Sequence, residues 1–198
     1  MPILTVPTVA VHRSFLAAWD EFGAEDGRRM GVHVYGDGEQ EWSREQADDP
    51  AEFARLVEGL QADAWPQTVL PPGIVHQTVL WFVEAGEWFG RLSIRHRLTP
   101  ALTEVGGHIG YVVRPSARRR GYATRMLAES LPIAAGFGIN PALLTCDVDN
   151  VASRKVIHAV GGQLLDARSG RLRFCVPTHI RGLTDPTRHA SDQLPRRR

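Results

Sequence analysis

The sequence predicts a mixed α/β protein of the α+β class, in which helices flank a central sheet. Two observations predict this class. Residues 11–22 and 50–60 carry apolar side chains at helical spacing. From residue 78 onward, short apolar runs separated by turn residues alternate with two further helical stretches. Strands of this kind need helices packed on them to bury their apolar faces, which favours a layered α+β domain.

The first 75 residues are predicted to form helices and loops. The run VHRSFLAAWDEF at residues 11–22 predicts an amphipathic helix, and the polar, glycine-bearing residues 23–49 predict mostly loop. Asp49 is a suitable N-cap and Pro50 suits a first helical turn, so a second helix is expected to begin there. Three prolines and a glycine at residues 65–73 predict an extended linker.

Residues 76–178 are predicted to form the sheet and its covering helices. The strands are expected at residues 78–83, 88–94, 107–113, 142–148, 163–167 and 172–176, and the helices at 121–135 and 150–160. We therefore predict one domain over residues 1–178. Residues 179–198 contain few apolar side chains and end in three arginines, which predicts a disordered tail.

Composition excludes several classes of protein. The net charge of +1 gives no general reason to expect a nucleic-acid partner. The only two cysteines, Cys146 and Cys175, lie in apolar runs, which indicates neither a disulfide framework nor a zinc site. The sequence has no basic, apolar leader and no run of about 18 apolar residues. We therefore expect no membrane contact and a reducing cytoplasm.

The segment GGHIGYVVRPSARRRGYATRML, residues 106–127, carries the main functional signal. A strand is expected to end at Val113, and a helix is expected to start near Gly121 after an arginine-rich loop. The free N–H groups and the positive dipole end of a helix N-terminus bind anions. Glycine lets the backbone approach a phosphate closely. The segment has neither a Walker nor a Rossmann pattern, so it predicts a different kind of diphosphate site.

This segment resembles the GNAT superfamily of N-acetyltransferases. Arg118-x-x-Gly121-x-Ala123 matches the family signature R/Q-x-x-G-x-G/A, and residues 150–157 (NVASRKVI) followed by Gly161-Gly162 resemble its second motif. Residues 81–176 are similar to a bacterial branch of predicted acetyltransferases. The resemblance implies the GNAT fold, with a central, splayed and mostly antiparallel sheet. It also makes residues 76–178 the core that binds acyl-CoA.

The resemblance implies an N-acyltransferase that moves an acetyl group from acetyl-CoA to a primary amine by direct transfer in a ternary complex. The expected acceptor is a small-molecule amine, no metal is needed, and a homodimer is compatible with the family. Two alternatives stay open, a catalytically silent module that binds acyl-CoA and a protein or peptide acetyltransferase. Trials of acetyl transfer to a panel of amines would separate them.

The family's cofactor contacts can be carried over by position. The strand residues are expected to pair through their backbone with the pantetheine arm, and an N–H near Val112 or Val113 to polarise the thioester carbonyl. The arginine loop is expected to bind the diphosphate, and Arg154 and Lys155 either meet the 3′-phosphate or form an ordinary basic helix surface. The predicted cofactor-binding residues are Tyr111, Val112, Val113, Arg118, Arg119, Arg120, Gly121, Tyr122, Ala123, Thr124, Asn150, Ser153 and Lys155.

The acceptor amine must be neutral to attack, so a general base or a water relay is expected. The resemblance places His108 and Glu104 as candidate bases, with Asp147 as a third. Each also has a purely structural interpretation, as a histidine bonded to a neighbouring strand or as a surface carboxylate. Arg95 and His96 either bind a carboxylate on the acceptor or pair with Glu104.

Many family members carry a tyrosine that protonates the departing thiolate. Ile157 occupies that position here, so this acid is predicted to be absent, and Tyr122 belongs to the loop. The loss of this acid is tolerable, because a thiol has a pKa of about 8.5 and its thiolate can leave without full protonation. Cys146 lies in an apolar strand, where burial raises a thiol pKa, so it is interpreted as a core residue rather than a nucleophile.

Overall fold

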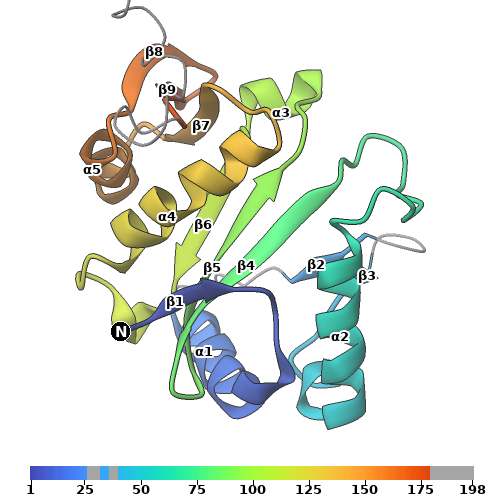
Figure 1. Ribbon diagram of the computed structural model, residues 1–198. Coiled ribbons are helices and arrows are strands. Elements are labelled where there is room, and N and C mark those ends of the chain that lie inside the picture. Colours follow the sequence, from blue (N-terminus) through green and yellow to red (C-terminus); the bar gives the residue numbers. More distant parts are fainter. Residues whose placement is uncertain (26–31, 36–39, 179–198) are drawn as a thin grey trace, which may run out of the picture.

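The computed structural model describes residues 1–25, 32–35 and 40–178, and it contains two separate antiparallel sheets (Figure 1). The main sheet has the strand order β1-β4-β5-β6, and the second has the order β7-β9-β8. These strands are β1 (Ile3–Thr5), β4 (Gln77–Glu84), β5 (Glu87–Arg95), β6 (Ile109–Val113), β7 (Ala142–Asp147), β8 (Gln163–Arg168) and β9 (Arg171–Val176). The α+β class and the mostly antiparallel sheet are confirmed. The predicted tail, residues 179–198, lies outside the described residues.

Helices cover both faces of the main sheet. In Figure 1, α4 (Tyr122–Gly136) crosses one face, and α1 (His12–Ala24) and α2 (Pro50–Ala62) lie on the other. The helix α5 (Val151–Ala159) packs beside the second sheet, and α3 (Pro100–Glu104) connects β5 to β6. Asp49 caps α2 as predicted, because its carboxylate accepts hydrogen bonds from the N–H groups of Ala51 and Glu52. None of the helices in the described ranges is long and apolar enough to span a bilayer.

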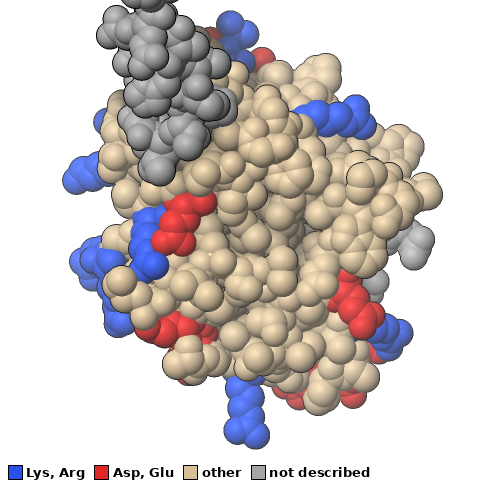
Figure 2. All heavy atoms as spheres, in the orientation of Figure 1, with Lys and Arg blue, Asp and Glu red and all other residues tan. Residues whose placement is uncertain are grey.

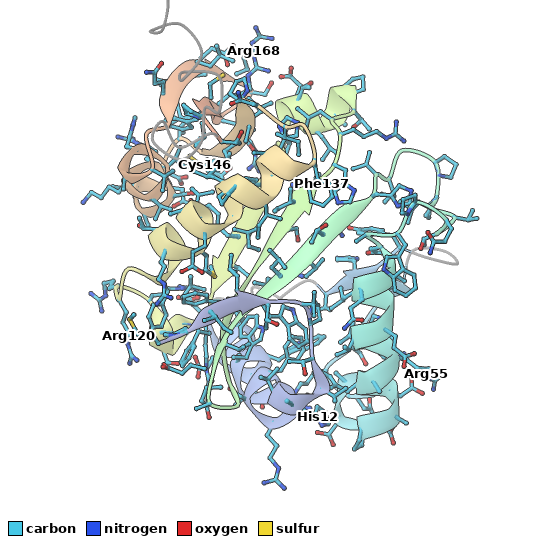
Figure 3. All side chains as sticks on the ribbon, in the orientation of Figure 1. His12, Arg55, Arg120, Phe137, Cys146 and Arg168 are labelled. Atoms are coloured by element: carbon cyan, nitrogen blue, oxygen red, sulfur yellow. The ribbon has the colours of Figure 1, made fainter. Side chains whose placement is uncertain are left out.

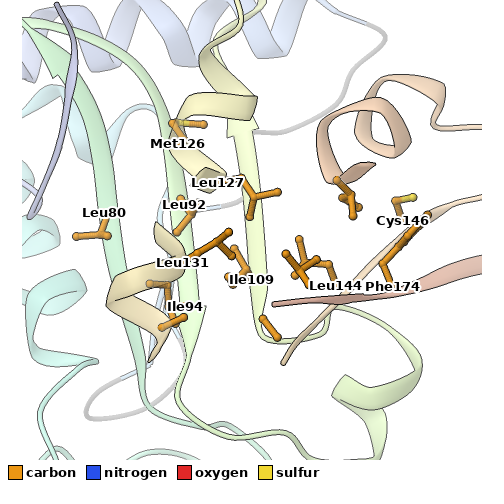
Figure 4. Close-up of a cluster of buried hydrophobic side chains, with 14 of the residues drawn as sticks. Leu80, Leu92, Ile94, Ile109, Met126, Leu127, Leu131, Leu144, Cys146 and Phe174 are labelled. Carbon is orange, nitrogen blue, oxygen red and sulfur yellow. The ribbon is translucent and has the colours of Figure 1, made fainter. Parts of the chain in front are cut away.

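Strand alternation divides the buried side chains between two cores. In β4, Leu80 and Phe82 face α4, and Val79 and Trp81 face α1 and α2. The α4 core continues into the second sheet through Leu144 and Phe174, and Figure 4 shows Cys146 at that end. Cys146 is therefore a core residue, and burial raises the pKa of its thiol.

The two sheets separate where β6 begins. The described residues join them at one isolated bridge between Gly107 and Leu144. There the N–H of His108 donates to the carbonyl of Leu143 at 2.7 Å. Beyond this bridge β6 and β7 diverge, so each has an inner edge that the other does not cover. The splayed sheet expected from the family resemblance is therefore present.

The sequence patterns missed the shortest elements. The strands β1, β2 (His33–Val34) and β3 (Gln40–Glu41) contain two or three residues each, too few to show a period. The ribbon of β2 and β3 lies within the segment predicted to be mostly loop. The five-residue helix α3 was also missed, although Thr99 caps it and Pro100 occupies its first turn. β1 covers the outer edge of β4, which would otherwise be unpaired.

Candidate active site

A cleft of about 640 Å³ opens where β6 and β7 diverge. Its walls are the end of β6, the turn before α4 and the first turns of α5. All of the predicted cofactor-binding residues line it except Arg120 and Lys155. We call this cavity the donor cleft.

The start of α4 offers uncapped backbone N–H groups to the donor cleft. Gly121 precedes the helix with φ +78°, and no side chain caps the first turn. Arg119 also has a left-handed backbone, with φ +62°. Tyr122, Ala123 and Thr124 form the first turn and all line the cleft. Because a helix N-terminus carries free donors and a partial positive charge, this turn is suited to an anion such as a diphosphate.

The three arginines before α4 occupy different positions. Arg118 is held in place by an ion pair with Glu25 at 2.6 Å and a hydrogen bond to the Val113 carbonyl at 3.2 Å. Arg119 lines the donor cleft beside it. Arg120 projects outward next to the start of α4 (Figure 3). Figure 2 shows Lys and Arg side chains gathered along the same edge of this face. Positive charge therefore lies on the α4 side of the cleft, and Asp147 and Asp149 lie on its other side.

The hydrogen-bond pattern of β6 decides which of its backbone groups face the donor cleft. Arg95 N donates to His108 O at 2.7 Å, and Arg114 N donates to Phe89 O at 2.9 Å. Antiparallel pairs alternate between bonded and non-bonded, so Gly110 and Val112 bond to β5 between these two points. The N–H groups of Tyr111 and Val113 consequently point toward the cleft, and that of Val112 does not.

The start of α5 forms the opposite wall. Asn150 caps this helix, because its side-chain oxygen accepts a hydrogen bond from Ser153 N at 2.9 Å. The Ser153 hydroxyl lies 2.7 Å from the Tyr111 hydroxyl across the cleft. Burial raises the pKa of Tyr111 to about 12, so this phenol is protonated at neutral pH.

A second cavity, of about 200 Å³, lies on the α1 and α2 side of the main sheet. We call it the acceptor cavity. Tyr111 and Val112 line this cavity as well as the donor cleft, so the two spaces meet at β6. Its polar side chains come from three strands and the segment after β2. They are His33, Tyr35, Gln77, Arg91, Ser93 and Arg95.

A scan of protein-family profiles matches residues 24–163 to the acetyltransferase (GNAT) domain. The chain belongs to the GNAT family. A search of curated proteins finds no match for this GNAT chain.

Solved GNAT structures have the same fold. RimJ of Mycobacterium smegmatis, solved with CoA-disulfide, superposes with a TM-score of 0.59 at 18% identity, over 88% of this chain and 80% of that one. The microcin C7 self-immunity acetyltransferase MccE, solved with acetyl-CoA and AMP, gives 0.57 at 13% identity, over 88% and 91%. A phosphinothricin acetyltransferase from Sinorhizobium meliloti, solved with acetyl-CoA, gives 0.52 at 15% identity, over 89% and 88%. At these identities the likeness concerns the fold alone.

Neither predicted base of this GNAT chain lines either cavity in the described residues. Nδ1 of His108 accepts a hydrogen bond from Leu143 N at 2.9 Å, next to the bridge between the two sheets. The Glu104 carboxylate lies 3.6 Å from Arg173 and 3.8 Å from Arg168. Asp147 lines the donor cleft and pairs with Arg171 at 3.3 Å. No grouping of metal-ligand side chains is found among the described residues.

The sequence patterns missed the acceptor cavity. Arg91, Ser93 and Arg95 alternate along β5 with Gly90, Leu92 and Ile94, which are buried on the other face. This period of two was a readable signal for a polar face. The contributions of His33 and Tyr35 had no such signal, because β2 has only two residues. His96, the next residue after Arg95, points to the other face of the sheet and does not line the acceptor cavity. It stacks on Phe137 and bonds to Thr78 at 2.8 Å.

Replacing His108 by alanine should lower the stability of the protein, because Leu143 N would lose its acceptor in a half-buried position. An unsatisfied N–H of this kind costs about 1–3 kcal/mol. Asparagine offers an oxygen at a similar distance from the backbone, so His108→Asn should recover much of the loss. Thermal unfolding of the two variants, together with their activities, tests this. If His108→Ala keeps the wild-type melting temperature and only its turnover falls, His108 is a base rather than a structural residue.

The burial of His108 also makes the stability depend on pH. Burial, with a smaller contribution from Arg95, lowers the pKa of His108 in the folded protein. The unfolded chain then binds more protons than the folded one as the pH falls below about 6.5, so stability is lost on acidification. We expect the melting temperature to fall between pH 7.5 and pH 5.5, and to fall less in His108→Asn, which has no imidazole to protonate.

Proposed function

We propose that this chain transfers an acetyl group from acetyl-CoA to a primary amine of a small molecule, directly and in a ternary complex. The observation that carries the proposal is the meeting of the donor cleft and the acceptor cavity at Tyr111 and Val112. Two substrates bound from opposite sides of β6 would bring their reactive groups together there. Holding reactants in such a geometry is a large part of catalysis.

The residues of the donor cleft fit acetyl-CoA. The uncapped first turn of α4 and the side chain of Arg119 supply donors and positive charge for the diphosphate. The N–H groups on the inner edge of β6 suit the amide groups of a pantetheine arm, as in the addition of a strand to a sheet. Asn150 and Ser153 lie on the facing wall. The bound cofactor would supply an acetyl group activated as a thioester.

The chain's own groups can then assist the transfer. The N–H of Val113 or Tyr111 faces the cleft and is the candidate donor to the thioester carbonyl, where a fixed donor stabilises developing negative charge. For the proton of the amine, His108 and Glu104 remain predictions that would require water relays. The structure adds His33, a histidine that lines the acceptor cavity itself.

Tyr111 is our candidate for the acid that protonates the departing thiolate, in place of the tyrosine absent at Ile157. Its phenol is protonated at neutral pH and contacts Ser153 in the donor cleft, and residue 111 lines both cavities. We expect Tyr111→Phe to lower kcat about 100-fold or more while the KM for acetyl-CoA changes little, because a positioned proton donor contributes about 100- to 10,000-fold. Steady-state kinetics measure both constants. A variant with wild-type kcat would exclude Tyr111 as the acid.

Thiol release from acetyl-CoA across a panel of small amines, peptides and aminoglycosides tests the activity. We expect turnover with a subset of the small amines, and product masses increased by one acetyl group. Tight binding of acetyl-CoA with no turnover on any acceptor would instead favour the catalytically silent module. Turnover confined to peptides would favour the protein acetyltransferase. We also propose a cytoplasmic location, and a homodimer is compatible with the family.

A further inference from the structure

We propose that the acceptor is a small amine that also carries an anionic group, and that Arg91 and Arg95 bind this group in the acceptor cavity. The inference deepens the proposed function and rests on it. It assigns a substrate class to the cavity on the α1 and α2 side of β6.

The strand β5 places both arginines on the same face. Arg91, Ser93 and Arg95 are two residues apart in turn, and all three line the acceptor cavity. Leu92 and Ile94 point the other way and are fully buried against α4. The two guanidinium groups are therefore held by a rigid, central strand rather than by an exposed loop, which suits a selective binding site.

Arg95 is fixed close to the point of transfer. Its Nη1 donates to the carbonyls of Gly106 and Gly107, at 3.3 and 3.1 Å. A β-carbon at Gly110 would lie 3.7 Å from Nη1 and 3.8 Å from Nη2, so the guanidinium lies over Gly110, one residue before Tyr111. A guanidinium has five N–H donors, and the two bonds to carbonyls leave others for an anion.

The carboxylate that could have paired with Arg95 is engaged elsewhere. Glu104 lies near Arg168 and Arg173, and it is not among the residues that line the acceptor cavity. Within the described ranges, Arg95 forms no ion pair. The hydrogen bonds that fix it are to neutral carbonyls, so its positive charge is not compensated by them.

The electrostatics of the cavity favour an anion. Loss of solvation lowers the pKa of both arginines, and Tyr35 offsets part of this lowering at each of them. The charge of Arg95 also lowers the pKa of Arg91. The described lining contains these two cations and no carboxylate. Asp63 accepts hydrogen bonds from Tyr35 N at 3.1 Å and from Gln77 at 3.5 Å, and it is not among the lining residues. An anion beside Arg95 would offset the charge that its bonds to the neutral carbonyls of Gly106 and Gly107 leave uncompensated.

The volume of the acceptor cavity suits a small acceptor. A cavity of about 200 Å³ holds roughly seven water molecules at about 30 Å³ each. That space suits a molecule of the size of an amino acid or an aminoalkylphosphonate. A carboxylate and a phosphonate share the same chemistry toward arginine, so the test must compare both.

The test measures kcat/KM by thiol release for α-, β- and γ-amino acids, each beside its own amide, and for 2-aminoethylphosphonate. We expect the best acid to exceed its amide by about 10- to 100-fold, as hydrogen bonds to a charged group would give. A phosphonate that outperforms every amino acid would identify the anion as phosphonate-like. Equal rates for acids and amides would overturn the inference but leave the proposed function standing.

Three variants assign the preference to the arginines. Arg91→Gln and Arg95→Gln should bring the ratio of acid to amide toward one, while the KM for acetyl-CoA stays the same. Arg95→Lys keeps a charge and should retain part of the ratio even if Arg95→Gln folds poorly. Arg55→Gln is the matched control, because Arg55 lies on the outer side of α2 and pairs with Glu52 (Figure 3). If the ratio of acid to amide is unchanged in both Gln variants, Arg91 and Arg95 do not bind the anionic group.

If no amine is turned over, calorimetry of the acids and amides with the CoA-saturated protein separates the two proposals. Acids that bind at least about 10-fold more tightly than amides in wild type, and not in Arg91→Gln, would keep the anion site while the proposed activity fails. Acids and amides that bind equally, together with the absence of turnover, would overturn both the anion site and the proposed activity.

Discussion

Replacing Gly121 by aspartate should lower the affinity for acetyl-CoA by about 100-fold or more. The new carboxylate would stand at the start of α4, beside the proposed diphosphate position. Two like charges about 4 Å apart repel by about 4 kcal/mol at an effective dielectric constant of 20, and each 1.4 kcal/mol is a factor of ten. The carboxylate would also compete for the uncapped N–H groups. Isothermal titration of acetyl-CoA measures the effect.

Gly121→Asn is the matched control. Asparagine has nearly the same shape as aspartate, and both tolerate the left-handed backbone that Gly121 adopts with φ +78°. Nothing lies within 4 Å of a β-carbon at this position, so either side chain can be accommodated in the cofactor-free protein. The difference between the two variants therefore isolates the charge. If both bind acetyl-CoA as wild type does, the diphosphate does not lie at the start of α4.

Gly107→Ala should destabilise the whole protein. A β-carbon there would lie 2.3 Å from the carbonyl oxygen of Leu143, and the backbone has φ +64°. Overpacking and a left-handed alanine together cost about 2–5 kcal/mol, against a typical total of about 5–15 kcal/mol. For a chain of this size that corresponds to a fall of roughly 10 °C in melting temperature. Differential scanning calorimetry measures it.

Gly136→Ala is the matched control, because it makes the same chemical change at a position where the added methyl group meets no other atom. Gly136 ends α4, has no left-handed φ, and has nothing within 4 Å of its β-carbon position. Alanine should be neutral there or stabilising by up to about 1 kcal/mol. If Gly107→Ala has the same melting temperature as wild type, Leu143 can move aside at little cost in free energy, and the bridge between the sheets is not rigid.

Local patterns in the sequence predict most of the fold, because its longer elements are regular and half-buried. The helix after Asp49 follows from a cap, a proline and an apolar stripe. β1 could not be predicted, since its three residues are strand only through pairing with β4, about eighty residues later.

The donor cleft and the acceptor cavity also differ in how far the sequence predicts them. The donor cleft is largely built from consecutive residues around Gly121, so a motif could indicate it. The acceptor cavity gathers Tyr35, Arg91 and Gln77 from separate strands and loops, and only tertiary packing brings them together. The backbone orientation of Val112 also required the ladder to β5, which sequence alone does not give.

The inner edge of β6 has a consequence for how this family can diverge. If the pantetheine arm pairs with the N–H groups of Tyr111 and Val113, then it is bound by atoms that every amino acid except proline carries. Substitution of these side chains would leave that part of the binding mode unchanged. Selection can thus replace most of the surrounding sequence while it preserves the strand geometry. This is consistent with structural neighbours that share 13–18% identity with this chain and yet superpose along most of its length.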